Sequence, residues 1–303
     1  MRILLTGSSG WLGQALAPRL RADGHEVIGL DPVAGPDTDI VGSVADRATV
    51  RAAIGDHRIE AIIHGGALHK PDIARLGREP FIGVNVGGTF NLLEEAVAQG
   101  VGRFVFTSTT SLLISKDVRA GAAGGAAKAE WITEATDPRP RNIYGVTKLS
   151  AEHLCRMFHE EQGLPVLVLR TSRFFPEDDD MAHEIAQSAE NTKANELLFR
   201  RLTQADAAEA HVVALEKAPA IGHDTFIISA PTPFSPADCE ELLRDAPSVV
   251  ACYFPDYPAL YGKMGWTMFG SIDRVYDASR ASRVLGFTAK TTFRTVLDEL
   301  AAT

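Results

Sequence analysis

The stretch Thr6-Gly7-Ser8-Ser9-Gly10-Trp11-Leu12-Gly13 decides the fold of this 303-residue chain. It follows a short apolar run and opens residues 11–22, where apolar side chains recur at helical spacing. In such a turn Gly7 permits the tight bend, Gly10 lets the backbone approach a pyrophosphate, and Gly13 allows close packing of helix on strand. The free N–H groups of Trp11 and Leu12 at the helix start would meet the charge of that anion. The motif alone would also suit a plain helix-entry turn.

The residue that ends the second predicted strand supports a dinucleotide site. Asp31 closes the apolar run 26–30 and is followed by Pro32, not by an arginine. A carboxylate at this place accepts hydrogen bonds from the adenosine ribose hydroxyls and repels a 2′-phosphate. The sequence therefore predicts NAD, in preference to NADP, as the cofactor.

Short apolar runs alternate with amphipathic patterns through the first half of the chain. The predicted strands are 2–6, 26–30, 60–63, 103–107 and 165–169, and the predicted helices are 11–22, 46–54, 80–99 and 144–162. This alternation predicts an α/β fold, a Rossmann-type doubly wound parallel sheet with helices on both faces. Ligands of such sheets bind beyond the carboxyl ends of the strands.

The pattern loosens in the second half, which indicates a second unit. We expect residues 1–170 to form the NAD-binding domain and residues 171–303 to form mostly a smaller C-terminal substrate-binding lobe. A segment of about 203–230 should return to the first domain, since it holds a further strand at 225–229. The chain closes with a predicted helix at 293–301, and the small residues of 121–127 are expected to form a loop.

Composition excludes several classes of protein. The net charge is −9 and the longest Lys/Arg run is Arg200-Arg201, so no basic patch for nucleic acid is evident. No stretch approaches the ~20 apolar residues of a membrane span, and the N-terminus does not resemble a signal peptide. Three cysteines without CxxC spacing argue against a disulfide framework and a thiolate zinc site. We therefore expect a cytoplasmic protein without a metal.

Tyr144 and Lys148 form the strongest candidate for chemistry. Their four-residue spacing puts both side chains on one helix face. A free tyrosine has a pKa near ~10, and a nearby ammonium would lower it. Tyr144 could then take a proton from a substrate hydroxyl while Lys148 also binds the nicotinamide ribose. An aromatic anchor beside a solvated lysine is the alternative for this pair taken alone.

Together these motifs resemble the extended short-chain dehydrogenase/reductases, the NAD-dependent epimerase/dehydratase family, over nearly the whole chain. The resemblance implies that Thr109, after the fourth strand, is the catalytic hydroxyl, with Ser108, Thr110 and Ser111 as open alternatives. It also implies several cofactor contacts, namely the turn Gly65-Gly66-Ala67, Asn85 and Thr171, beside those of the first turn, Tyr144 and Lys148.

The chain departs from the family in three places that bear on the reaction. Thr110-Ser111 stands where dehydratases carry an Asp-Glu pair, which argues against dehydration. Arg173 replaces the asparagine that contacts a sugar diphosphate. It would suit a carboxylate or phosphate, or else form a salt bridge to the acidic run 177–180. The segment 176–202 is shorter than the corresponding segment of the nucleotide-sugar enzymes, which favours a small substrate. In this respect the chain is similar to the uronate dehydrogenases of the family.

These observations predict an NAD-dependent oxidoreductase acting on a hydroxyl or carbonyl of a small polar substrate such as a sugar or sugar acid. The expected substrate contacts are His69, Thr110, Ser111 and Arg173. The alternative is a nucleotide-sugar epimerase without net redox change, and a non-catalytic dinucleotide sensor is a third possibility. The apolar helices 80–99 and 144–162 are expected to pair in a homodimer, as they do in the family.

Overall fold

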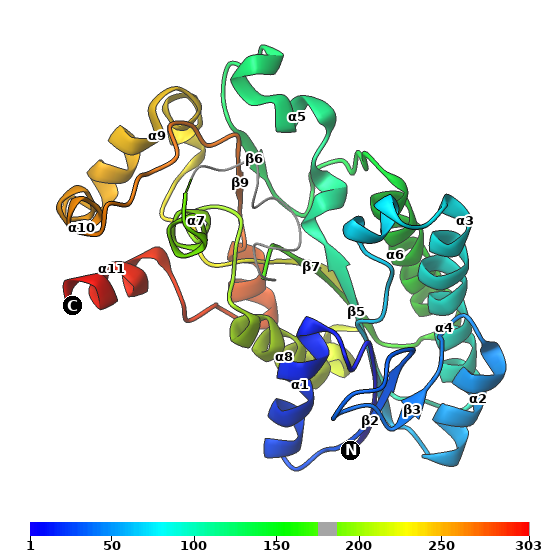
Figure 1. Cartoon of the computed structure of the whole chain (residues 1–303). Coiled ribbons are helices and arrows are strands. Elements are labelled where there is room, and N and C mark those ends of the chain that lie inside the picture. The colour runs from blue at the N-terminus through cyan, green and yellow to red at the C-terminus, as the bar shows by residue number, and fades with distance from the viewer. Residues whose placement is uncertain (175–186, 303) are drawn as a thin grey trace.

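Seven parallel strands form the central sheet of the computed structural model, which describes residues 1–174 and 187–302 (Figure 1). Their spatial order is β3-β2-β1-β4-β5-β7-β8. The strands are β1 (Arg2–Thr6), β2 (Glu26–Asp31), β3 (Ile40–Val41), β4 (Ala61–His64), β5 (Phe104–Thr109), β7 (Val166–Thr171) and β8 (His223–Ile228). The order runs outward in both directions from β1 and β4, so the crevice between these strands is the switch point at which ligands bind. The predicted doubly wound α/β fold is confirmed.

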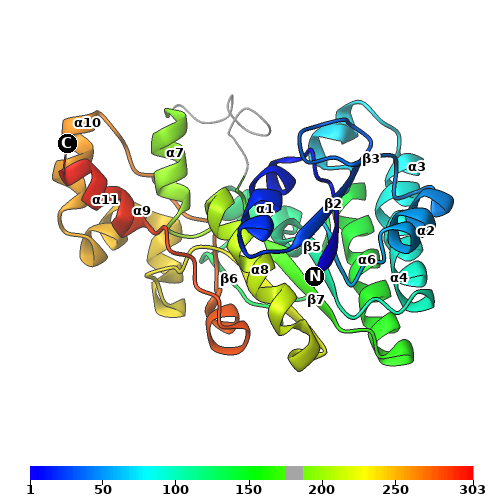
Figure 2. The same ribbon diagram turned by 90° about the horizontal axis from the view of Figure 1, so that it is seen from below.

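Helices cover both faces of this sheet (Figures 1 and 2). On one face α1 (Trp11–Ala22) packs against α8 (Gln204–Ile221). On the other lie α2 (Arg47–Asp56), α4 (Gly88–Ala98) and α6 (Ile143–Gln162). Coverage on two sides explains why the strands are almost continuously apolar, with no alternation of apolar and polar residues.

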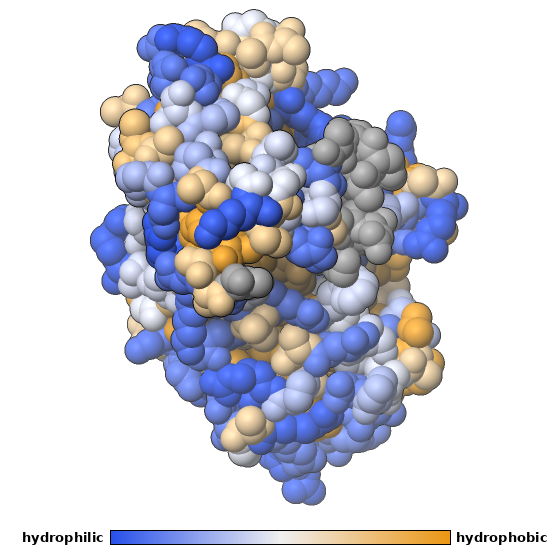
Figure 3. Space-filling model, turned by 60° about the vertical axis from the view of Figure 1, so that its left-hand side comes forward, coloured by the Kyte–Doolittle hydropathy of each residue, from blue (hydrophilic) through white to orange (hydrophobic). Residues whose placement is uncertain are grey.

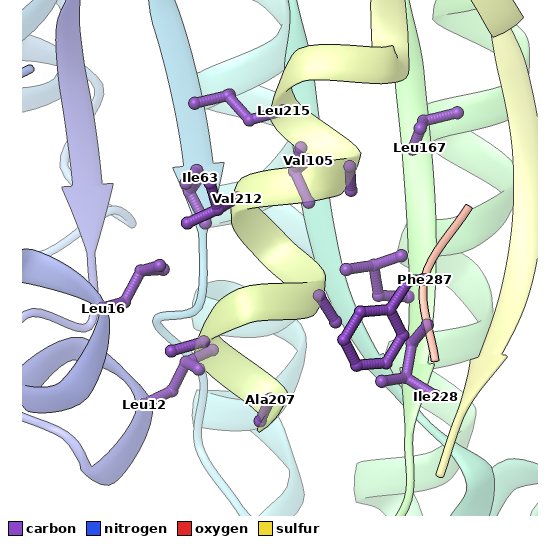
Figure 4. Close-up of a cluster of buried hydrophobic side chains, with 14 of the residues drawn as sticks. Leu12, Leu16, Ile63, Val105, Leu167, Ala207, Val212, Leu215, Ile228 and Phe287 are labelled. Atoms are coloured by element: carbon purple, nitrogen blue, oxygen red, sulfur yellow. The ribbon is translucent and has the colours of Figure 1, made fainter. Parts of the chain in front are cut away.

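Figure 4 shows the apolar core between the sheet and the α1/α8 layer. Leu16 from α1 and Leu215 from α8 point toward Ile63 and Val105 of the central strands. These side chains are 0% exposed. Removing one of them down to alanine would cost ~2–5 kcal/mol, because the surroundings of such a cavity relax only partly.

A second apolar cluster holds together the lobe at the left of Figure 2. Its helices are α7 (Ala189–Glu196), α9 (Cys239–Tyr253), α10 (Tyr257–Met264) and α11 (Phe293–Ala301), the last as predicted. Beside them a two-stranded parallel sheet joins β6 (Glu130–Ile132) to β9 (Arg274–Tyr276). The small lobe thus includes β6 from the first half of the sequence. In contrast, β8 is a strand of the large sheet, and α8 packs on that sheet.

The structure differs from the predicted elements in one helix of the first half. Residues 80–99 do not form one helix: α3 (Arg78–Phe81) leads into a π-helical segment, Ile82–Gly87, and only then into α4. Gly83, Gly87 and Gly88 weaken regular helix here because glycine has the lowest helix propensity after proline. The predicted loop 121–127 contains a short 3₁₀ turn, Gly121–Gly124, after α5 (Lys116–Ala120).

The surface is mostly polar. On the face drawn in Figure 3, hydrophilic residues predominate and hydrophobic ones gather in separate patches. None of the helices among the described residues combines the length and apolar character needed to span a bilayer.

Candidate active site

The first glycine turn forms a cradle in which two glycines, Gly7 and Gly13, leave no room for a Cβ. Gly7 has φ +77°, and a Cβ there would lie 2.8 Å from the backbone nitrogen of Gly66. A Cβ on Gly13 would collide with the carbonyl oxygen of Gly7. Gly10 precedes α1 without a capping side chain, so the amides at the start of the helix are left for a ligand. This geometry fits the pyrophosphate of a dinucleotide.

The two residues that begin α1 can contribute only main-chain groups to that cradle. The Leu12 side chain lies in the core between α1 and the sheet, and the Trp11 ring is 50% exposed. Both were predicted as cofactor contacts through their N–H groups.

Asp31 lies beside the cradle at the end of β2. Its carboxylate accepts the backbone N–H of Ser9 at 3.1 Å and that of Val33 at 2.8 Å. The residue is only 8% exposed. Each carboxylate oxygen keeps a second lone pair, so Asp31 is held in place and can still accept a ribose hydroxyl.

A chain of hydrogen bonds links the first glycine turn to the second, Gly65-Gly66-Ala67. The Gly66 N–H donates to Thr6 Oγ1 at 3.1 Å, and this hydroxyl lies 2.7 Å from His64 Nδ1. His64 Nε2 lies 3.0 Å from Thr89 Oγ1, which donates to the Asn85 carbonyl at 2.7 Å. The directions are consistent only if Thr6 donates to Nδ1 and Nε2 carries the proton. Burial holds the pKa of His64 well below its usual value, so the ring is neutral.

Asn85 lies in the π-helical segment and fastens the loop after β4 to α6. Its side chain accepts the Leu68 N–H at 2.8 Å and donates to the Leu68 carbonyl at 3.0 Å. The same amide nitrogen lies 3.1 Å from Thr147 Oγ1. These bonds occupy the amide, and the residue is 2% exposed. Asn85 was predicted as a cofactor contact; in this geometry it supports the site from behind.

Thr109, Tyr144 and Lys148 meet at the carboxyl end of β5. Asn142 caps α6 by accepting the Gly145 N–H at 3.0 Å, which starts the helix just before Tyr144. The Thr109 hydroxyl donates to Ser111 Oγ at 3.1 Å, and Thr109 lines the same cleft as Tyr144. Lys148 Nζ lies 4.0 Å from the centroid of the Phe106 ring, and the lysine is 3% exposed.

The electrostatics of this trio differ from the expectation that Lys148 lowers the pKa of Tyr144. Burial raises the pKa of Tyr144 to about 12, against a smaller opposing effect of the Thr109 hydrogen bond. Burial also lowers the pKa of Lys148 to about 7, against attractions that include Glu152. In this enclosed site desolvation outweighs the charge of the neighbour, since it penalises phenolate and ammonium alike.

Behind Lys148, one helical turn further along α6, Glu152 forms a buried network that sequence reasoning missed. Its carboxylate accepts the Ser108 hydroxyl at 2.5 Å and the Arg170 guanidinium at 2.8 Å. Glu152 and Arg170 are both 7% exposed. Ser108 directly precedes Thr109, so this network joins β5, β7 and the helix that carries Tyr144.

The predicted substrate residues line one cleft. The rings of His69 and Tyr144 are tilted by 38° with centroids 5.6 Å apart, and Ser111 donates its N–H to Thr109 Oγ1 at 3.1 Å. Thr110 is 4% exposed, and its hydroxyl points to the Thr171 carbonyl at 3.4 Å. Thr171 in turn donates to the Ser108 carbonyl at 2.9 Å.

Arg173 lines the same cleft and forms an ion pair as well. Its Nε lies 3.7 Å from Glu196 Oε2. The alternative partner considered for it, the acidic run 177–180, lies outside the described residues. Sequence reasoning did not find the other cleft residues Arg119, Arg141, Arg200, Arg274 and Tyr276, because they come from separate elements and no motif joins them. Within residues 1–174 and 187–302, no group of three or more His, Cys, Asp or Glu could hold a metal ion.

Comparison with known proteins places this geometry in a family. The model of the NAD dependent epimerase/dehydratase family matches residues 3–228. A uronate dehydrogenase of Pseudomonas putida is 26% identical over 59% of this chain and 63% of its own. An L-arabinose 1-dehydrogenase (NAD(P)(+)) of Haloferax volcanii is 25% identical over 98% of this chain and 99% of its own. An uncharacterised protein of Sinorhizobium fredii is 32% identical, but the match spans only 39% of its length.

Solved structures share the fold over the full chain. A short-chain dehydrogenase/reductase superfamily protein from Agrobacterium tumefaciens with bound NAD aligns with a TM-score of 0.70 and 23% identity, covering 100% of this chain and 96% of that one. At this level of identity the likeness shows the fold alone.

Proposed function

This chain belongs to the NAD-dependent epimerase/dehydratase family, and from that premise we propose that it is an NAD-dependent oxidoreductase. It moves a hydride between NAD and a hydroxyl or carbonyl of a small polar substrate such as a sugar or sugar acid. The observation that carries the proposal is that Thr109, Tyr144 and Lys148 line one cleft at the carboxyl end of β5, which Gly65 of the second glycine turn also lines.

The described residues fit NAD without a basic patch. The cradle of Gly7, Gly10 and Gly13 would take the pyrophosphate against the amides that open α1, and Asp31 would bind the adenosine ribose. Gly65, Gly66 and Ala67 would pack against the dinucleotide, and Lys148 would donate to the nicotinamide ribose. When bound, NAD supplies the hydride acceptor or donor.

Thr109 and Tyr144 would handle the proton. Thr109 donates a hydrogen bond to the reacting oxygen and steadies its developing charge. With the pKa of Tyr144 raised to about 12 by burial, the phenol is protonated at neutral pH. It is therefore ready to donate a proton during carbonyl reduction, whereas oxidation of a hydroxyl requires a more favourable environment for the phenolate.

The relatives support a sugar or sugar acid as substrate. One is named a uronate dehydrogenase and another an L-arabinose 1-dehydrogenase, and the second aligns over nearly its whole length. The chief alternative is a nucleotide-sugar epimerase, since UDP-glucose 4-epimerases share the fold. A non-catalytic sensor of the dinucleotide is less well supported, because Tyr144 and Lys148 are both buried in the site.

A panel of sugars and sugar acids offered with NAD separates these functions. A dehydrogenase accumulates NADH, which is measured by its near-ultraviolet absorbance. An epimerase converts its substrate with no lasting change in that absorbance, and a sensor binds NAD but converts nothing. Absence of NADH formation with every member of the panel, together with absence of NADH consumption with the matching carbonyl compounds, would contradict the proposal.

We also propose a cytoplasmic homodimer. Three apolar side chains from the predicted pairing helices are exposed, Ile82 (55%), Phe90 (37%) and Val146 (45%). A shared helix face would bury these three side chains in the dimer.

The free Cys252 is exposed, which suits the reducing compartment that we propose, the cytoplasm. Sedimentation at micromolar concentration tests the dimer, and a monomer there would refute it.

A further inference from the structure

The strand that carries Thr109 extends beyond one of its two neighbours. β5 pairs with β4 only as far as Phe106. In the part of the chain that the structure describes, residues 107–109 pair with β7 but not with β4, and all three line the active-site cleft. Backbone that is hydrogen-bonded along one edge alone opens more easily than the middle of a sheet. The position of the Thr109 hydroxyl therefore depends on what else holds this strand end.

On the face of the sheet that α8 covers, a buried histidine holds Thr107. Thr107 Oγ1 lies 2.8 Å from His211 Nε2, and His211 Nδ1 lies 2.7 Å from the Ala207 carbonyl oxygen. Burial lowers the pKa of His211 to about 4, so the ring is neutral at pH 7. Because a carbonyl can only accept, Nδ1 carries the single ring proton, and Nε2 accepts the proton of the Thr107 hydroxyl.

On the opposite face, which α6 covers, Glu152 holds the next residue (Figure 1). The Ser108 hydroxyl donates to Glu152 Oε1 at 2.5 Å, and Arg170 fixes the other oxygen of the carboxylate at 2.8 Å. Successive side chains of a strand point to opposite faces, so two adjacent residues of β5 reach helices of different layers. Neither Glu152 nor His211 is among the described residues that line the cleft.

We propose that Glu152 and His211 are positioning residues that hold the end of β5 from its two faces and so fix the Thr109 hydroxyl against the reacting oxygen. Glu152 acts through Ser108, and His211 acts through Thr107. A displacement of a reacting group by about 1 Å can lower the rate ~10²-fold, so two hydrogen bonds behind the cleft can govern turnover. The effect on turnover rests on the proposed function, whereas the attachment of the strand end does not.

Removing one attachment at a time tests the proposal by kinetics. Ser108→Ala removes the donor to Glu152, whose carboxylate keeps Arg170, and Thr107→Val removes the donor to His211. We expect kcat to fall ~10-fold in each variant and ~10²-fold in the two combined, with KM and the affinity for NAD within ~2-fold of the wild type. The matched control is Ser248→Ala, which removes a hydroxyl that donates to a carboxylate at an exposed place on α9. It should keep the wild-type kcat.

A double variant separates positioning from support of the fold. Thr107→Val/His211→Leu removes both partners of one hydrogen bond, which costs little stability, whereas Thr107→Val alone leaves a buried acceptor unpaired. The double variant should therefore regain the denaturation midpoint but keep the low kcat, and a kcat that recovers with the midpoint would overturn the positioning role. His211→Gln keeps an acceptor for Thr107, so its kcat should exceed that of His211→Leu. If the histidine variants fail to fold, Ser108→Ala decides.

Hydrogen exchange tests the attachment without turnover and separates the two proposals. The amides of residues 107–109 should exchange ~3–10-fold faster in Ser108→Ala and Thr107→Val than in the wild type and Ser248→Ala. Equal exchange in all four proteins would overturn the attachment. Wild-type kcat in both β5 variants would overturn the positioning role and leave the oxidoreductase intact. Faster exchange in a protein that neither forms nor consumes NADH with any sugar would refute the oxidoreductase and support the attachment.

Discussion

The cofactor half and the substrate half of the site differ in the groups that they present. At the cofactor half, the uncapped start of α1 after Gly10 leaves backbone amides for a ligand, and the side chain of Asp31, which lies beside this turn, is itself an anion. At the substrate half, guanidinium groups such as Arg200 and Arg274 line the wall. Backbone amides recognise a fixed geometry, whereas long side chains on loops and edges can change with the substrate. From this contrast we infer that the fold binds the same cofactor while the residues of its substrate half can change with the substrate.

Replacing the proton donor where the halves meet should have the largest effect. Tyr144→Phe removes the phenolic proton and keeps the ring, so turnover should fall by at least ~10³-fold while NAD still binds. Steady-state kinetics and NAD titration measure the two effects separately. Tyr253→Phe, on an exposed ring of α9, serves as the control. Turnover retained in Tyr144→Phe would refute the assigned acid–base residue.

A methyl group placed in the cradle should break the cofactor half alone. Gly13→Ala brings a Cβ onto the Gly7 carbonyl, and such overpacking costs ~1–3 kcal/mol, with a weaker affinity for NAD. Gly262→Ala makes the same change within α10, where nothing lies within 4 Å of the new Cβ. That control should be neutral or slightly stabilising. Equal denaturation midpoints and equal NAD affinities in the two variants would contradict the close approach.

Removing the Asp31 carboxylate beside the first glycine turn should change which dinucleotide is accepted. Asp31→Asn keeps an acceptor for the Ser9 N–H but no longer repels a 2′-phosphate. We expect the ratio of kcat/KM for NAD over NADP to fall ~10-fold, since about 1.4 kcal/mol corresponds to a factor of ten. Asp39→Asn, whose carboxylate accepts the Gly29 N–H, is the matched control. An unchanged ratio would remove Asp31 from cofactor selection.

The smallest expected effect lies behind the site. Glu152 attracts the Lys148 ammonium, so Glu152→Gln should lower the pKa of Lys148 further below its value of about 7. If the ammonium form of Lys148 is the active one, kcat falls as the pH rises through the pKa of this lysine. In Glu152→Gln this fall should occur at a pH lower by ~0.5–1 unit. Glu95→Gln breaks a comparable pair, with Arg47 at 2.8 Å, on α4. It should leave the profile unchanged, and an equal shift in both variants would refute the role of Glu152.

The cofactor half could be predicted from the sequence, and the substrate half largely could not. The glycine turn, Asp31 and the Tyr144/Lys148 spacing are local patterns, because a turn and one helix face are set by residues close in sequence. The strands near them were predicted to within a few residues. The arginines of the substrate half come from α5, the loop before α6, the segment after β7, the segment after α7, and β9. No local pattern brings them together, and only the folded chain does.

Two errors have physical reasons of the same kind. Residues 80–99 carry an apolar pattern that suggests one helix, but the π-helical segment turns Asn85 into a clasp between Leu68 and Thr147. The pKa of Tyr144 was expected to follow its charged neighbour. It follows burial instead, and burial depends on the whole tertiary structure.

The hydrogen-bond chain through His64 gives the cofactor half a built-in sensitivity to acid. The neutral ring accepts from Thr6 on one side, and a protonated ring would present a second donor to a hydroxyl that already donates toward it. Since the pKa of His64 is lower in the folded chain than in the unfolded one, stability is lost as the pH falls below the ordinary histidine range. Thr6, which directly precedes the first glycine turn, hydrogen-bonds this ring, and the second turn directly follows His64. Acidification should therefore lower the free energy of unfolding of the fold that holds both glycine turns in place.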